Sequence, residues 1–140
     1  TAISNTGSNN SIAPVVNPFR SPDSALSDAQ LRGKALFERT AANDGKPLPE
    51  RAQCHFCHSG SVYTDHQAFD VGSRSPTDES GDYDTAHLTN IFESAPYLHD
   101  GRAATLEEIW TKYNPEDRHG VSSDWTKQQL NDLVEYLKNL

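Results

Sequence analysis

The chain has 140 residues, enough for one domain, and its 34% hydrophobic content with a mean hydropathy of −0.74 predicts a small core. The formal net charge of −8 excludes a basic nucleic-acid-binding surface and favours a partner with a basic docking patch. No apolar segment is long enough to span a membrane and no signal peptide is visible, so we expect a mature form or a domain of a longer protein.

The first 25 residues differ in composition from the rest of the chain. Residues 1–25 are rich in Ser, Asn, Thr and Pro, which is typical of a linker, so we place one domain at residues 26–140. Ser27-Asp28-Ala29-Gln30 is a capping box and predicts a helix that runs to about Thr40. Gly33, inside this helix, would let another helix approach closely.

A short motif follows the loop that ends at Arg51. Cys54-His55-Phe56-Cys57-His58 has the Cys-x-x-Cys-His pattern of covalent haem attachment, in which two thiols add to the haem vinyl groups and the histidine is the proximal iron ligand. A structural zinc site would need a second ligand pair, and a redox dithiol would normally lie beside alternating strands; neither is present in the sequence. The motif therefore predicts one covalent haem c on Cys54 and Cys57 with His58 on the iron, and hence a periplasmic or secreted bacterial protein.

The second half of the chain predicts loops and two further helices. Residues 59–87 lack apolar periodicity and are predicted to form a long haem-wrapping loop. Thr105-Leu106-Glu107-Glu108 begins a helix that Asn114-Pro115 ends, and Ser122 or Ser123 is predicted to cap a final helix to Leu140. No strand signal is present. The prediction is an all-α cytochrome c fold around one haem, with long haem-wrapping loops.

Three segments carry a family resemblance. Residues 62–72, residues 88–91 and Ala95-Pro96-Tyr97-Leu98-His99-Asp100-Gly101-Arg102 resemble the C-terminal haem domain of the bacterial di-haem cytochrome c peroxidases and of the related methylamine-utilisation haem enzymes. The resemblance covers about residues 26–140 and implies the same all-α fold. This chain departs from the family in having one haem motif instead of two. It also has Thr89 where the family commonly has arginine, and Arg102 is the candidate to supply that charge near the haem propionates.

The sixth iron ligand is predicted from the same resemblance. The chain contains no methionine, so a His/Met haem is excluded. Counted from the Thr-Leu-Glu-Glu helix start, Tyr113 holds the position of the axial methionine of the peroxidases and of the axial tyrosine of the methylamine-utilisation enzymes. His119, on a loop that we expect to be flexible, and an open or water-bound site are the alternatives. His66 and His99 are predicted to be hydrogen-bonding partners in the haem loops.

Two classes of function compete at this point. An electron carrier needs only a six-coordinate haem, whereas a peroxidase-like enzyme needs an open iron position and a distal acid–base group, for which a domain of this size has little room. We therefore predict an electron carrier that is not an enzyme and works outside the cytoplasm, as a monomeric domain of a larger secreted protein. Its redox partner would be a copper mono-oxygenase, a cupredoxin or another cytochrome. A peroxidase-like enzyme and a gas- or redox-sensing haem module are the alternatives.

Overall fold

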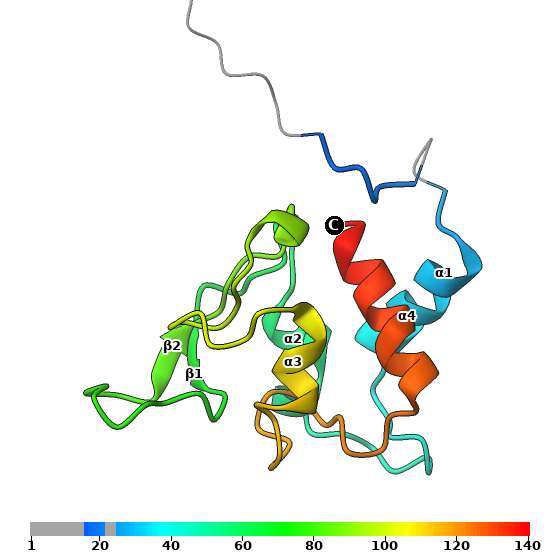
Figure 1. The fold of residues 1–140 in the computed structure, drawn as a ribbon. Helices are drawn as coiled ribbons and strands as arrows, with labels where there is room; N and C mark the ends of the chain where they lie inside the picture. Colours follow the sequence, from blue (N-terminus) through cyan, green and yellow to red (C-terminus); the bar gives the residue numbers. More distant parts are fainter. Residues whose placement is uncertain (1–15, 22–24) are drawn as a thin grey trace, which may run out of the picture.

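The structure is a computed structural model that describes residues 16–21 and 25–140 (Figure 1). Most of the predicted linker, residues 1–15 and 22–24, lies outside the described residues. The described elements, in chain order, are α1 (Asp28–Phe37), the 3₁₀ turn η2 (Glu50–Ala52), α2 (Cys54–Cys57), β1 (Ala68–Asp70), β2 (Asp82–Asp84), the 3₁₀ turn η3 (Ile91–Glu93), α3 (Leu106–Thr111) and α4 (Lys127–Lys138).

The first and last helices begin at capping boxes. The Ser27 hydroxyl accepts a hydrogen bond from the Gln30 backbone N–H, which confirms the predicted start of α1. Helix α4 begins later than predicted, because Thr126 forms the capping box with Gln129. The two serines predicted as caps are used elsewhere, since their backbone N–H groups both donate to the carboxylate of Asp117.

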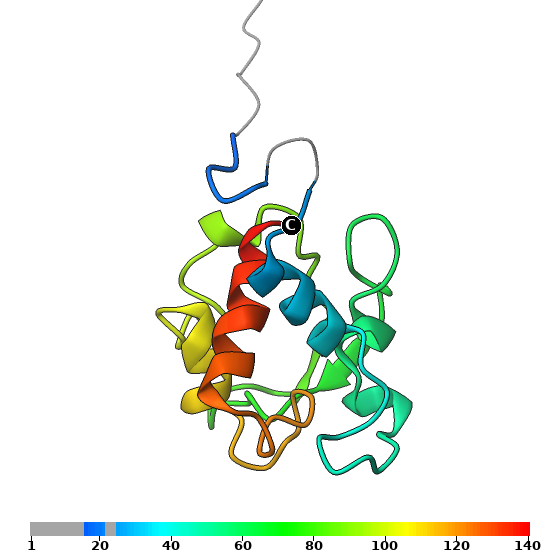
Figure 2. The same ribbon diagram turned by 90° about the vertical axis from the view of Figure 1, so that its right-hand side faces the viewer.

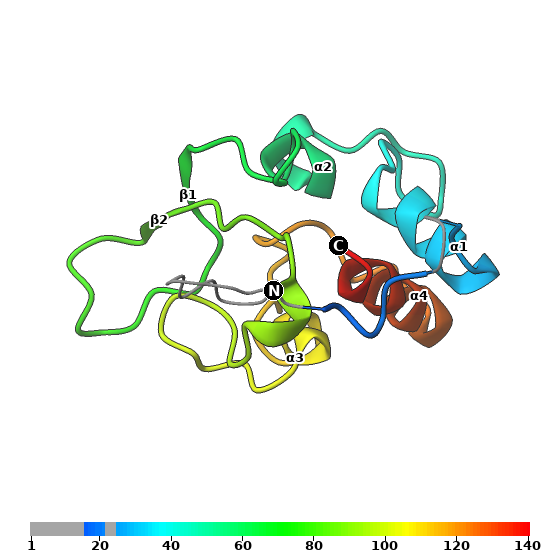
Figure 3. The same ribbon diagram turned by 90° about the horizontal axis from the view of Figure 1, so that it is seen from above.

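Helices α1 and α4 pack against each other and form the main helical layer (Figures 2 and 3). A Cβ added at Gly33 would lie 1.9 Å from the backbone oxygen of Asp132, so the predicted close helix approach at this glycine is confirmed. Arg32 donates two hydrogen bonds to the Asp132 carboxylate, at 2.8 and 3.1 Å. Leu133 is fully buried and centres the core, which includes Leu36, Phe37, Leu106, Ile109, Val134, Tyr136 and Leu137.

The structure corrects the prediction of a purely helical fold. Strands β1 and β2 pair antiparallel, with Ala68 opposite Asp84 and Asp70 opposite Asp82, and they lie on the side of α2 and α3 away from α1 (Figure 1). The strands have three residues each, too few for an alternating pattern to be visible in the sequence. Asp78 closes the loop between them, because its carboxylate accepts hydrogen bonds from the Ser75 backbone N–H and the Tyr83 hydroxyl.

The described part of the predicted linker, residues 16–21, lies against the end of α4. Asn17 Nδ2 donates to the backbone oxygen of Lys138 at 2.8 Å, and the Ser21 N–H donates to Asn139 Oδ1 at 2.9 Å. The last carbonyl groups of a helix lack partners within the helix, so this segment satisfies part of that deficit. In the part of the chain that the structure describes, no helix has the length and apolar character needed to cross a membrane.

Candidate haem site

The Cys-x-x-Cys-His motif forms a single helical turn that arranges its three side chains. Helix α2 runs from Cys54 to Cys57, and the His58 backbone N–H donates to the Cys54 oxygen at 2.9 Å to close the turn. Residues three apart lie on the same face of a helix, so both thiols are presented together and the imidazole follows them directly. This is the donor set that covalent haem attachment requires.

His58 is oriented by a backbone carbonyl. Its Nδ1 lies 3.1 Å from the Tyr63 oxygen, and because a carbonyl can only accept, Nδ1 must carry the proton. Nε2 is then left with a free lone pair for a metal. Burial lowers the pKa of His58, and its contacts with the backbone oxygens of Tyr63 and Ala86 partly oppose that shift. The lowered pKa favours the neutral imidazole, and the contact with the Tyr63 oxygen favours the tautomer with Nδ1 protonated.

The two cysteines are partly buried, and their surroundings raise the pKa of both thiols. Burial raises the pKa of Cys54 to about 11, an effect that the positive charge of Arg39 opposes, and burial also raises the pKa of Cys57. A redox-active dithiol requires a lowered thiol pKa, because the thiolate is the reactive form. The structure therefore argues against a thioredoxin-like role for the pair.

A second imidazole, that of His119, lies close to this motif. Burial lowers the pKa of His119 to about 4, and the neighbouring His58 contributes to the shift. The next residue, Gly120, is so close to α2 that a Cβ there would lie 4.0 Å from Cys54 Sγ. The His119 loop thus borders the haem motif, and its imidazole is neutral at physiological pH and able to bind iron.

Several hydrogen bonds hold the loop that carries His119, which differs from the expectation that it is flexible. The His119 backbone N–H donates to Asn114 Oδ1 at 2.7 Å, and the His119 oxygen accepts from Trp110 Nε1 at 3.3 Å. Asn114 also donates to the Gly120 oxygen at 2.8 Å. These contacts hold the backbone on both sides of the imidazole.

Tyr113 and Arg102, the other two predicted site residues, lie next to each other. The Arg102 guanidinium is 5.8 Å from the centre of the Tyr113 ring, within the range of a cation–π contact. Its ion pair with Asp100, at 2.7 Å, raises the pKa of Arg102, so a carboxylate already balances this charge. Tyr113 follows the end of α3 and is half-buried against the core.

His99 acts as a packing residue in the loops, as predicted. Its Nε2 lies 3.0 Å from an Asp78 carboxylate oxygen and its Nδ1 lies 3.2 Å from the hydroxyl of the buried Ser73. The imidazole also stacks on the Tyr83 ring, with 3.7 Å between ring centres. With both ring nitrogens occupied, His99 has no free lone pair for iron.

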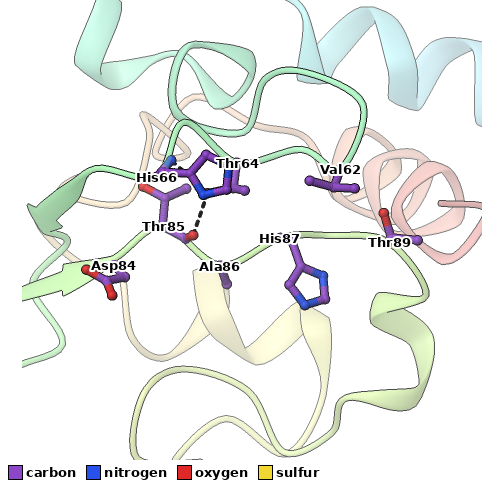
Figure 4. Close-up of a pocket in the computed structure, with 8 residues that line it drawn as sticks. All are labelled: Val62, Thr64, His66, Asp84, Thr85, Ala86, His87 and Thr89. Carbon is purple, nitrogen blue, oxygen red and sulfur yellow. Dashed lines mark hydrogen bonds between the residues drawn. The ribbon is translucent and has the colours of Figure 1, made fainter.

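A cavity of about 510 Å³ lies beside the segment that follows the haem motif. It is lined by Val62, Thr64, His66, Asp84, Thr85, Ala86, His87 and Thr89 (Figure 4). The Thr64 hydroxyl donates to the Thr85 backbone oxygen at 2.6 Å and ties its two walls together. The cavity includes Thr89, the residue found in place of the family's arginine, but none of the three motif side chains.

Two observations indicate that the described residues fit a haem group. Two thiols on one turn, an imidazole with Nε2 free and a second neutral imidazole form a suitable donor set. In addition, two buried nitrogens, His55 Nδ1 and Trp125 Nε1, have no hydrogen-bond partner among the described residues. His55 lies between the two cysteines, and Trp125 packs on Trp110, with 5.5 Å between ring centres. Buried polar atoms without partners are rare, so these two nitrogens are available to a bound group.

Sequence reasoning missed two contributors to this site. The Tyr63 backbone oxygen leaves no trace in the sequence, because every residue has a carbonyl group. Asn114 was interpreted as the end of a helix before a proline, and its hydrogen bonds to residues five to eight positions later are visible only in the folded chain.

No family model matches the chain. The chain is 34% identical, over 89% of its length, to hydrazine synthase subunit gamma of Kuenenia stuttgartiensis, of which it covers 44%. It is 28% identical to methylamine utilization protein MauG of Methylophilus methylotrophus, again over 89% of the chain and 38% of that protein. The chain spans less than half the length of both curated relatives.

Two solved structures share the fold. A structure of Kuenenia stuttgartiensis hydrazine synthase matches 89% of this chain and 50% of its own, with a TM-score of 0.69 and 30% identity. A MauG-like protein associated with microbial copper homeostasis matches 85% of this chain and 48% of its own, with a TM-score of 0.57 and 24% identity. The second likeness shows the fold alone.

These comparisons correct one prediction and support another. The prediction that the chain is not an enzyme is wrong, because the relatives include a subunit of hydrazine synthase and are components of enzymes or enzyme-like haem proteins. The prediction of haem c is supported by the motif for covalent attachment, which α2 forms, together with the likeness to both relatives. Over most of its length the chain is therefore similar to hydrazine synthase subunit gamma and to MauG.

Proposed function

We propose that this chain is the electron-transferring haem c domain of a larger redox enzyme. The observation that carries the proposal is the single turn of α2, which presents two thiols and a correctly protonated imidazole to one group. The relatives support a place within an enzyme, since the chain covers only 44% of a hydrazine synthase subunit. In this proposal the domain binds one haem, and a second redox centre lies elsewhere in the complete protein or in its partner.

The haem supplies an iron that changes its oxidation state by one electron. The chain's own residues decide what else it can do. His58, held in place by the Tyr63 carbonyl, would provide one nitrogen ligand. We infer that His119, in preference to Tyr113, would be the second protein ligand of the iron, because the loop that carries it borders Cys54 and its imidazole neighbours that of His58. An iron with two protein ligands has no position open to substrate, which favours electron transfer.

The charge of the domain supports a cationic partner. The net charge of −8 is part of this argument, and the exposed Asp82 and Asp84 on β2 contribute to it, whereas Asp70 is paired with Arg118. Complementary charge mainly increases the rate of association, and that effect weakens as salt screens it. We propose a redox protein or domain with a basic docking patch as the partner, and a periplasmic or secreted location.

A direct experiment tests the haem and its role together. The chain is produced with haem-maturation machinery, and its intact mass is expected to exceed that of the polypeptide by one haem. Cys54→Ala and Cys57→Ala together should abolish this covalent addition. Rapid-mixing reduction by a cationic cytochrome is then expected to slow as salt is added. A mass equal to the bare polypeptide would contradict the assignment of haem c, and a rate independent of salt would contradict the basic partner.

A further inference from the structure

We propose that Asn114 is the positioning residue that sets the sixth iron ligand, by fixing the His119 backbone before haem binds. This inference rests on the proposed function, in which His119 is that ligand. Asn114 lies just before Pro115 and is only 4% exposed. Its side chain points into the loop that carries His119 and is fully engaged there.

The amide of Asn114 contacts the backbone on both sides of the His119 side chain. Oδ1 accepts from the His119 N–H at 2.7 Å, and Nδ2 donates to the Gly120 oxygen at 2.8 Å. Nδ2 also lies 2.9 Å from the Ser122 hydroxyl oxygen and, more weakly, 3.4 Å from the His119 oxygen. Because both the N–H and the C=O groups around His119 are held, the direction of its Cα–Cβ bond is fixed.

The carboxylate of Asp117 holds another part of the same loop. Asp117 has a positive φ of 56° and accepts hydrogen bonds from the N–H groups of Ser122 and Ser123 at 2.9 and 3.0 Å. Gly120 is a second residue of this loop with a positive φ, of 73°, a conformation that glycine adopts without strain. The contacts of Asn114 and Asp117 together therefore leave the loop few alternative conformations.

The chemistry of the position favours asparagine. Its short side chain carries an acceptor for one N–H and donors for nearby oxygens. An aspartate of the same size would keep the acceptor, but it would place negative charge against the Gly120 oxygen and lose the donors. An alanine would remove the acceptor and the donors, and it would leave the His119 N–H without its hydrogen-bond partner. A preformed ligand loop also lowers the entropy lost when iron binds.

The test compares variants of the ferric, haem-loaded chain by optical and electron paramagnetic resonance spectra and by titration with imidazole. Imidazole binds only where the protein ligand has left the iron, so its apparent affinity reports how firmly His119 is held. Losing the two shortest Asn114 bonds is expected to strengthen apparent imidazole binding by about tenfold or more in Asn114→Ala, with a new high-spin fraction. Asn114→Asp, which keeps the volume but places a carboxylate against the Gly120 oxygen, should also strengthen apparent imidazole binding relative to the parent.

Two further variants separate the possible outcomes. Asn43→Ala is the matched control, because the Asn43 amide also donates two hydrogen bonds, to the Asp124 oxygen at 2.7 Å and to Gln129, and it should keep the parent spectrum. His119→Ala should open the iron completely. A parent-like spectrum in His119→Ala would overturn the ligand assignment and this inference with it. A changed spectrum in His119→Ala, together with parent-like imidazole binding in both Asn114 variants, would overturn this inference alone.

Discussion

The contact between α1 and α4 at Gly33 predicts whether replacing this glycine with alanine raises or lowers the stability of the protein. In an exposed helix, replacing glycine with alanine stabilises a protein by about 1 kcal/mol, because alanine has the higher helix propensity. At Gly33 the added Cβ would lie 1.9 Å from the Asp132 oxygen and 2.6 Å from its carbonyl carbon. Both atoms belong to the backbone of α4, so no side-chain rotation can relieve the clash.

The expected result for Gly33→Ala is a net loss of stability. Overpacking of this kind costs about 1–3 kcal/mol, and separating the helices would also loosen Leu36 and Leu133 in the core. We therefore expect the free energy of unfolding to fall by about 2 kcal/mol, which corresponds to a decrease of roughly 10 °C in Tm. Denaturant and thermal unfolding of the haem-loaded chain, followed by circular dichroism, measure both quantities.

The control for this variant lies on the same helix. Ala35 is exposed, so Ala35→Gly should cost about 1 kcal/mol through helix propensity alone. The haem spectrum should be unchanged in both variants, because the predicted ligands lie outside α1. A Gly33→Ala chain that is more stable than the parent would refute the close helix packing described above.

Three further predictions concern the surroundings of the haem motif. Hydrogen bonding to Arg39, at 2.8 Å, lowers the pKa of Asp124. The pair should therefore contribute stability above about pH 3.8 and lose that contribution as the pH falls further. Asp124→Asn should lower the free energy of unfolding by about 1 kcal/mol at pH 7 and by little in acid, as measured by urea unfolding. Tyr63→Phe should leave the haem spectrum unchanged, because His58 bonds to the backbone oxygen; a shifted spectrum would show that the phenol matters. His99→Ala should increase hydrogen exchange over residues 68–84 without changing the spectrum, and unchanged exchange would contradict its role in packing that loop.

The sequence predicts those features of the structure that depend on residues close together in the chain. The Cys-x-x-Cys-His motif and the capping box at Ser27 are complete within a few residues, so their local geometry follows from the sequence. The start of α4 was misplaced because Asp117, several residues earlier, takes the N–H groups of the predicted serine caps. The β-hairpin was missed because its strands are too short to show a pattern and depend on Asp78 in the loop between them.

The candidate site was predicted in part for the same reason. Residue types identified the haem and its proximal histidine as candidates, but the choice between Tyr113 and His119 depends on how the chain folds back past α2. The loop of His119 looked flexible because its restraints come from Asn114 and Trp110, which have no recognisable pattern. The prediction that the chain is not an enzyme failed because it treated the domain's small size as the size of the working unit, whereas the chain covers less than half of its curated relatives.

The most direct test of the proposed ligation is near-infrared magnetic circular dichroism of the ferric, haem-loaded chain. The charge-transfer band in this region depends on the two axial ligands and distinguishes two imidazoles from an imidazole with a phenolate or with water. We predict the band of two imidazoles, from His58 and His119, and its loss in His119→Ala. A band from imidazole and phenolate that disappears in Tyr113→Phe, or a high-spin spectrum with one protein ligand, would contradict this account.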